Sequence, residues 1–107
     1  MDRRLFNDIF TRGVFFDGTY LSGKVSPLSP GTPTQFACVV SKKVLSKAVD
    51  RNRLRRRLYS ALYPLLDHLK AESGIIILAK PEIVKIDFEE LKTMLINLLK
   101  HHNIYHD

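Results

Sequence analysis

The spacing of apolar residues along the chain predicts three helices. Residues 3–12 place apolar side chains at helical spacing, and Gly13 follows where such a helix can end. From residue 54 onward leucines recur every three or four positions, which indicates an amphipathic helix that covers a core. Pro64 falls inside this pattern and predicts a kink or a break just before it. Asp87, followed three residues later by Glu90, has the capping-box pattern that starts a last helix.

The segments between these helices have the composition of strands and loops. Residues 14–25 are rich in aromatic and β-branched side chains, and Gly18 and Gly23 interrupt them, which predicts one or two short strands with a bend. Two short apolar runs, at residues 36–40 and 75–79, predict strands that are buried on both faces. Three prolines and a glycine make residues 26–35 a loop, which we expect to be the most mobile part of the chain.

The order of these elements predicts an α+β fold. A helix, one or two strands, a strand, a helix, a strand and a helix are expected to form a small mixed sheet packed with helices. The strands at 36–40 and 75–79, joined by the long helix, can form a parallel pair. The 107 residues have the length of one domain, and 45% hydrophobic with 26% charged residues is an ordinary globular balance. We therefore expect residues 1–107 to form a single domain.

Cysteine content and hydropathy narrow the cellular setting. The chain has one cysteine, Cys38, which excludes an internal disulfide and fits a reducing compartment. No apolar run approaches the ~20 residues that span a bilayer. The first residues include an acid and lack a signal-peptide pattern. These features predict a cytoplasmic protein with no membrane partner.

The net charge of +6 is concentrated in one segment. Residues 41–57 hold eight of the 17 basic residues and one of the 11 acidic ones, so this segment carries +7 and the rest of the chain −1. The basic residues are Lys42, Lys43, Lys47, Arg51, Arg53, Arg55, Arg56 and Arg57. A local cationic surface of this kind is expected for a polyanionic partner.

The arginines favour a nucleic acid as that partner. On a helix, Asn52, Arg53 and Arg56 lie opposite the leucine stripe, and Arg55 and Arg57 flank it. Crowded guanidinium groups repel one another unless water or an anion is beside them, and their planar forks match phosphate oxygens. Asn52 adds an amide that suits a 2′-hydroxyl or a base edge. The alternative is a solvated helix face paired with scattered acids, but only Asp50 is near in sequence.

Neighbouring features argue against two common modes of nucleic-acid recognition. A helix that reads a DNA groove follows a short helix and a tight turn, whereas here a strand and the basic connector SKKVLSKAVD precede Arg51. The aromatic string of the RNA-recognition sheet is absent. DNA is therefore not an expected partner.

The string VVSKKVLSKAVDRNRLRRRLYSAL resembles the signature of the ribonuclease P protein family. That family carries a basic pair, a short linker with alanine, and then an R-N-R stretch followed by further basic residues. The matching positions are Ser41, Lys42, Lys43, Ala48, Arg51, Asn52, Arg53, Arg55 and Arg56. Looser matches in residues 6–13, in IIILAKP and in FEELKTMLINLL extend the resemblance over nearly the whole chain.

The resemblance implies a protein subunit of bacterial ribonuclease P, the endoribonuclease that removes the 5′ leader of precursor tRNA. The implied fold is that of ribosomal protein S5 domain 2. Phe6, Phe10 and Arg12 would contact the single-stranded leader, since unpaired bases stack on exposed rings; core packing is the alternative for both rings. The strand after Gly13 departs from the family pattern, which leaves Phe16 and Tyr20 as candidates for a leader contact from that strand. The implied contacts to the catalytic RNA subunit are Lys42, Lys43, Lys47, Arg51, Asn52, Arg53, Arg55, Arg56 and Arg57.

The resemblance also implies that the RNA performs the chemistry. Phosphodiester hydrolysis needs positioned divalent ions and a water, and the acidic residues of this chain are scattered. We expect no catalytic residue and no metal ligand on the chain, no cofactor bound by the protein alone, Mg²⁺ in the holoenzyme, and a monomer bound 1:1 to the RNA. His101, His102 and His106 predict a frayed polar tail. The alternatives are a general RNA-binding protein, a nuclease active without an RNA subunit, and a DNA-binding regulator.

Overall fold

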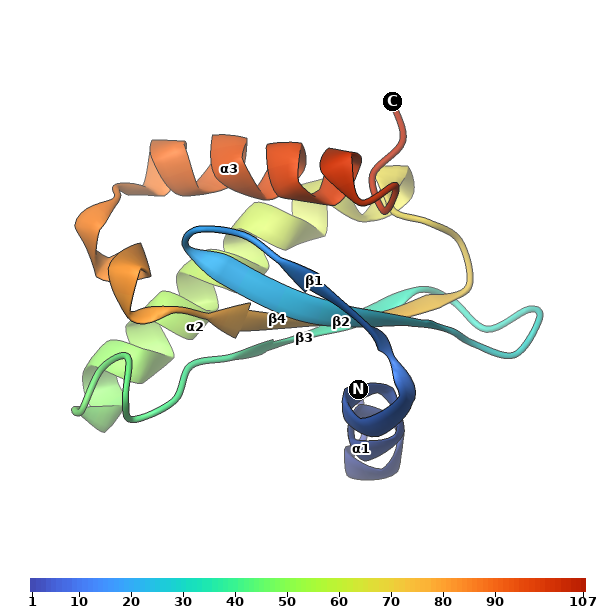
Figure 1. The fold of residues 1–107 in the computed structure, drawn as a ribbon, viewed down its shortest axis with the longest axis horizontal. Helices are drawn as coiled ribbons and strands as arrows, with labels where there is room; N and C mark the ends of the chain where they lie inside the picture. The colour runs from blue at the N-terminus through green and yellow to red at the C-terminus, as the bar shows by residue number, and fades with distance from the viewer.

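The computed structural model describes residues 1–107. It has three layers, and the middle layer is a single sheet. Figure 1 shows α2 and α3 on one face of the sheet and α1 on the opposite face. The predicted α+β class is confirmed. In chain order the elements are α1 (Arg3–Arg12), β1 (Val14–Asp17), β2 (Leu21–Pro27), β3 (Gln35–Val39), α2 (Ala48–Leu62), the 3-10 helix η1 (Tyr63–His68), β4 (Ser73–Ala79), the 3-10 helix η2 (Pro81–Lys85) and α3 (Phe88–His101).

The strands are arranged in the order β1-β2-β4-β3. β1 and β2, and β2 and β4, are antiparallel, while β3 and β4 form the predicted parallel pair. The prediction that β3 is buried on both faces is wrong. Phe36 and Cys38 are buried on the side of α2, but Ala37 and Val39 are only half-buried on the opposite side. The physical reason is that α1 packs against β2 and β4 and leaves the β3 edge of that face uncovered.

The aromatic segment after Gly13 forms an antiparallel hairpin of β1 and β2. Gly18 lies in the turn, where a Cβ would come within 2.9 Å of Leu98 Cδ1, so a glycine lets the turn approach α3. Gly23 lies opposite Phe16 in the ladder, and a Cβ there would overlap the Phe16 ring. The two glycines therefore allow the hairpin to lie against α3 with Phe16 in the core.

The main core lies between the sheet and the layer formed by α2 and α3. The central strand β4 supplies Ile75 and Ile77 to it, and both are almost completely buried. Burial of one such side chain stabilises the fold by about 1.5–3 kcal/mol. Their partners in the core include Phe16, Leu21, Leu58, Leu62, Leu91, Leu95 and Leu99.

The ends of the helices follow the expected local rules. α2 ends at Leu62 and continues as η1, because Pro64 cannot donate the hydrogen bond that an α-helix requires, so the predicted break is confirmed. The Asp87 carboxylate accepts a hydrogen bond from the Glu90 backbone N–H at 2.8 Å and caps α3 as predicted. Asp2 caps α1 in the same way. None of the helices is both long and apolar enough to cross a lipid bilayer.

Two apolar anchors fix the ends of the chain. Ile9 of α1 is buried against the sheet next to Gly74. A Cβ added at Gly74 would overlap the Ile9 side chain. At the other end Ile104 is buried and Tyr105 forms a β-bridge with Leu69. The prediction of a frayed C-terminal tail is therefore wrong, because Ile104 holds this segment against η1.

Candidate nucleic-acid interface

The five arginines of α2, which we call the arginine strip, lie on a helix whose other side is buried. Leu58, Ala61 and Leu62 enter the core, so the amphipathic pattern turns the polar residues toward solvent. Asn52, Arg53, Arg56 and Arg57 are exposed, and Arg51 and Arg55 are half-buried. Arg53, Arg56 and Arg57 thus border one depression of the surface, whereas Arg51 and Arg55 lie closer to the buried side of the helix.

No arginine of the strip takes part in an ion pair. The four ion pairs of the structure join Arg12 to Asp8, Lys80 to Asp17, Lys92 to Glu89 and Lys100 to Asp107. The start of α2 lacks a side-chain cap, and its first turn holds one acidic residue, Asp50, which forms no ion pair with an arginine. Five like charges without counterions destabilise the isolated protein and favour an anionic partner.

Arg51 and Arg55 use part of their donor capacity within the chain. Arg51 Nη1 donates to the carbonyl oxygens of Leu45 at 3.1 Å and Ser46 at 2.7 Å. Arg55 donates to the side-chain oxygen of Asn52. Arg51 therefore holds the connector before α2, which carries the exposed side chains of Lys42, Lys43 and Lys47, against the helix. A guanidinium group has five N–H donors, so both arginines retain donors for a ligand.

A second candidate surface lies on α1. The rings of Phe6 and Phe10 are stacked, with centroids 5.9 Å apart and planes 15° apart. Phe10 is 44% exposed and Phe6 is half-buried, whereas Ile9 makes the buried contact with the sheet. Core packing, the alternative function of these rings, therefore does not account for Phe10.

The sheet adds two residues to this surface that the sequence did not single out. Lys24 of β2 donates to the Phe10 carbonyl oxygen, and its ammonium lies 4.8 Å from the Phe10 ring centroid. Phe15 of β1 faces Lys24 across the hairpin and is 57% exposed. Phe16 and Tyr20, the candidates from sequence, lie on the other side, in the core and against α3. Phe6, Phe10, Phe15 and Lys24 form what we call the aromatic face.

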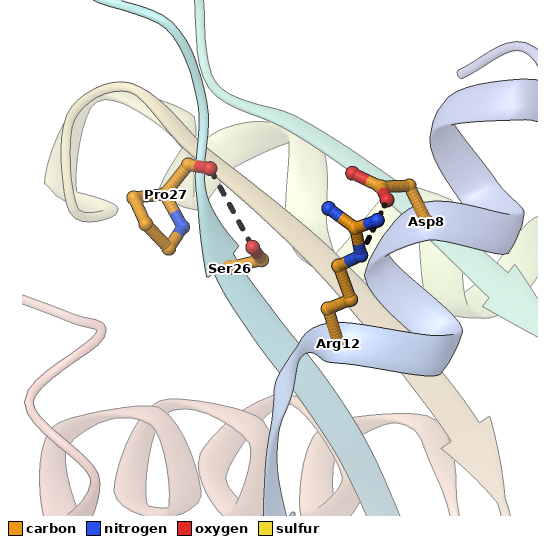
Figure 2. Close-up of polar contacts among 4 residues, drawn as sticks. All are labelled: Asp8, Arg12, Ser26 and Pro27. Atoms are coloured by element: carbon orange, nitrogen blue, oxygen red, sulfur yellow. Dashed lines mark hydrogen bonds and ion pairs between the residues drawn. The ribbon is translucent and has the colours of Figure 1, made fainter.

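Arg12 lies at the end of α1 and is paired within its own helix. Figure 2 shows its side chain turned back onto Asp8, with Nε 3.4 Å from the carboxylate. At the adjacent end of β2, Ser26 Oγ donates to the Pro27 carbonyl oxygen at 3.5 Å. Both members of the Arg12–Asp8 pair are largely exposed, and such pairs contribute only about 0–1 kcal/mol. Arg12 can therefore exchange its partner for a phosphate at little cost.

The one cysteine and the metal-ligating side chains can be placed in the structure. Burial raises the pKa of the Cys38 thiol from 9.0 to about 12, so a neutral solution contains almost none of the nucleophilic thiolate. No three His, Cys, Asp or Glu side chains converge in a way that could hold a metal ion. The two candidate surfaces include α2 and α1, which Figure 1 shows on opposite faces of the sheet.

Comparison with protein families gives one consistent result. Residues 1–103 match the family model described as Ribonuclease P. A ribonuclease P protein component from a Pseudanabaena species is 36% identical over 104 residues, which cover 97% of this chain and 90% of the relative. Another, from Listeria welshimeri, is 30% identical over 95 residues, which cover 89% of this chain and 79% of the relative.

Several ribonuclease P proteins of known structure have the same fold. The protein from Staphylococcus aureus superposes with a TM-score of 0.86 over 99% of this chain and 95% of its own, at 18% identity. The protein from Thermotoga maritima superposes with a TM-score of 0.79 over 92% of each chain, at 25% identity. The superposition with the Staphylococcus aureus protein therefore covers nearly the whole fold.

Proposed function

The chain belongs to the family of bacterial ribonuclease P protein components, and from this premise we propose that its arginine strip binds the catalytic RNA subunit. Membership makes the chain part of the endoribonuclease that processes tRNA and a partner of ribonuclease P RNA. The single observation that carries the proposal is a strip of five arginines without one intramolecular counterion. Each phosphate that a guanidinium neutralises releases counterions, which drives association and makes it salt-dependent. Lys42, Lys43, Lys47 and Asn52 extend the contact surface.

We further propose that the aromatic face and Arg12 bind the 5′ leader of precursor tRNA. Unpaired bases stack on Phe6, Phe10 and Phe15 without regard to sequence, and Lys24 and Arg12 contact phosphates. The exposed rings support this assignment, because a face used only for packing would bury Phe10 and Phe15. Because Figure 1 shows α2 and α1 on opposite faces of the sheet, one molecule can contact both RNAs at once.

We propose a division of labour in the holoenzyme that is consistent with these surfaces. The RNA holds the Mg²⁺ ions and performs the hydrolysis, while the protein, in a 1:1 complex in the cytoplasm, neutralises phosphates and holds the leader. Neutralised phosphates repel one another less, so the RNA needs a lower concentration of Mg²⁺ to fold. Leader contacts raise the affinity for precursor over mature tRNA, because mature tRNA has no leader to bind.

Reconstitution tests the proposal. The purified chain is added to a bacterial ribonuclease P RNA at a Mg²⁺ concentration at which the RNA alone is nearly inactive, and cleavage of precursor tRNA is measured. We expect activity only when both components are present, a loss with Arg53→Ala/Arg56→Ala, and no loss with Lys100→Ala, which removes a cation at the far end of α3. Cleavage by the chain without an RNA subunit would support the nuclease alternative. Tighter binding to duplex DNA than to structured RNA would support the DNA-binding regulator.

A further inference from the structure

A small hollow lies between α2 and the segment formed by η2 and the start of α3. Its volume is about 190 Å³, and its apolar lining includes Leu54, Ile83 and Leu91. Arg53 and Arg57 line it from the strip, and Val84 and Phe88 line it from the other element. A shallower depression of about 340 Å³ has Arg53, Arg56, Arg57, Ser60 and Phe88 as its lining. Phe88 thus borders both hollows, which together we call the Phe88 notch.

The apolar lining of the notch is not explained by phosphate binding. A surface that only neutralises phosphates needs donors and charge, whereas here Val84 is 55% exposed and the half-buried Phe88 lines both hollows together with Arg53 and Arg57. Exposed apolar surface beside unpaired cations suits a ligand with a flat apolar part and a negatively charged part. A nucleotide outside a helical stack has both, in its base and its phosphate.

We propose that the Phe88 notch binds one unstacked nucleotide of the RNA subunit. The base packs against the Phe88 ring and the apolar lining, and the adjoining phosphates contact Arg53, Arg56 and Arg57. This inference rests on the proposed function of the arginine strip and deepens it. It adds a contact to a base where the strip alone provides contacts to the backbone.

The remaining charged groups of the notch are compatible with a base. The Lys92 ammonium lies over the Phe88 ring, 5.1 Å from its centroid, and also pairs with Glu89. Asp87 already caps α3 through the Glu90 N–H. Asp50 also lines the notch and forms no ion pair, so its carboxylate can accept a hydrogen bond from an exocyclic amino group. The notch therefore favours a base that carries such a group.

The test separates stacking from charge by using salt. Binding of a bacterial ribonuclease P RNA is measured between 50 and 200 mM salt for wild type, Phe88→Leu, Phe88→Tyr and Arg53→Ala. Phe88→Leu keeps apolar bulk at the start of α3 but removes the aromatic ring on which a base could stack. We expect it to bind about 5- to 150-fold more weakly at every salt concentration, with an unchanged slope of log K against log salt. Phe88→Tyr should bind like wild type, and Arg53→Ala should lower the slope by about one.

A matched control is Tyr105→Leu, which also removes a partly buried ring. The Lys100 ammonium lies over this ring, 5.2 Å from its centroid. It should bind like wild type, and thermal unfolding shows whether each variant is folded. Three results would each contradict the proposed binding of a base in the notch. Phe88→Leu could bind like wild type, Phe88→Tyr could lose as much affinity as Phe88→Leu, or Phe88→Leu could change the slope. A slope unaffected by Arg53→Ala would instead contradict the RNA-binding function of the strip, so the two failures can be told apart.

Discussion

Replacement of Phe10 by alanine tests the leader surface, because its effect should depend on the substrate. The ring is 44% exposed, stacked on Phe6 and 4.8 Å from the Lys24 ammonium, so the change removes an exposed stacking surface. Stacking of a base on a ring contributes about 1–3 kcal/mol, which corresponds to a 5- to 150-fold change in Kd. We expect the Kd of the holoenzyme for precursor tRNA to rise by this factor and the Kd for mature tRNA to stay unchanged.

The cost to folding should be modest. A fully buried phenylalanine replaced by alanine costs about 3–5 kcal/mol. Phe10 is nearly half exposed and the buried contact of α1 is made by Ile9, so the free energy of unfolding should fall by less than that range. Thermal unfolding measures this loss, and both tRNAs are assayed at a temperature at which the variant is folded.

The outcome is decided by the ratio of the two dissociation constants. Thr11→Ala, at an exposed position of α1 that carries no ring, should leave the ratio at its wild-type value. If Phe10→Ala weakened binding of precursor and mature tRNA equally, the ring would support the structure and not the leader. If it weakened neither, stacking on α1 would play no part in substrate binding.

Three further perturbations test charge, burial and packing. Arg53→Ala/Arg56→Ala should lower the slope of log K against log salt for RNA-subunit binding by about 2. The loss of affinity between 50 and 200 mM salt should then be roughly tenfold smaller for the variant than for wild type. Because burial raises the pKa of Cys38 from 9.0 to about 12, the unfolded chain loses its thiol proton first, and stability should fall by about 1.4 kcal/mol per pH unit between pH 9 and about pH 12. Cys38→Ala should lack this component in urea titrations across that range. Gly74→Ala should destabilise the protein by about 1–3 kcal/mol in the same assay, because its Cβ overlaps Ile9; an unchanged midpoint would refute that packing.

Features governed by neighbours in sequence could be predicted from the sequence. The break of α2 before Pro64 depends on one missing donor, and the cap of α3 depends on Asp87 and the N–H three residues later. The exposed strip follows from helical periodicity alone. These elements needed no knowledge of tertiary contacts, and the structure contains them as predicted.

Features governed by distant partners could not be predicted. Phe15 and Phe16 are adjacent and chemically identical, and only pairing with β2 decides which one faces Lys24 and which one enters the core. The half-exposed side of β3 depends on how far α1 extends over the sheet. Ile104 in the C-terminal segment is one apolar residue among polar ones, and its burial against the core could not be read from a local pattern.

Cleavage of RNA from a probe placed on α2 tests the central claim most directly. Cys38 is buried with a pKa of about 12, so a cysteine introduced elsewhere can be labelled selectively with an iron chelate that generates hydroxyl radicals. Ser60→Cys is exposed and borders the same depression as Arg53, Arg56 and Arg57, whereas Thr93→Cys is exposed on α3 beside the β1–β2 turn. We predict that a chelate at position 60 cuts a bacterial ribonuclease P RNA at a few defined nucleotides and that one at position 93 does not. Cleavage from position 93 but not from position 60, with both complexes formed, would contradict docking through the arginine strip.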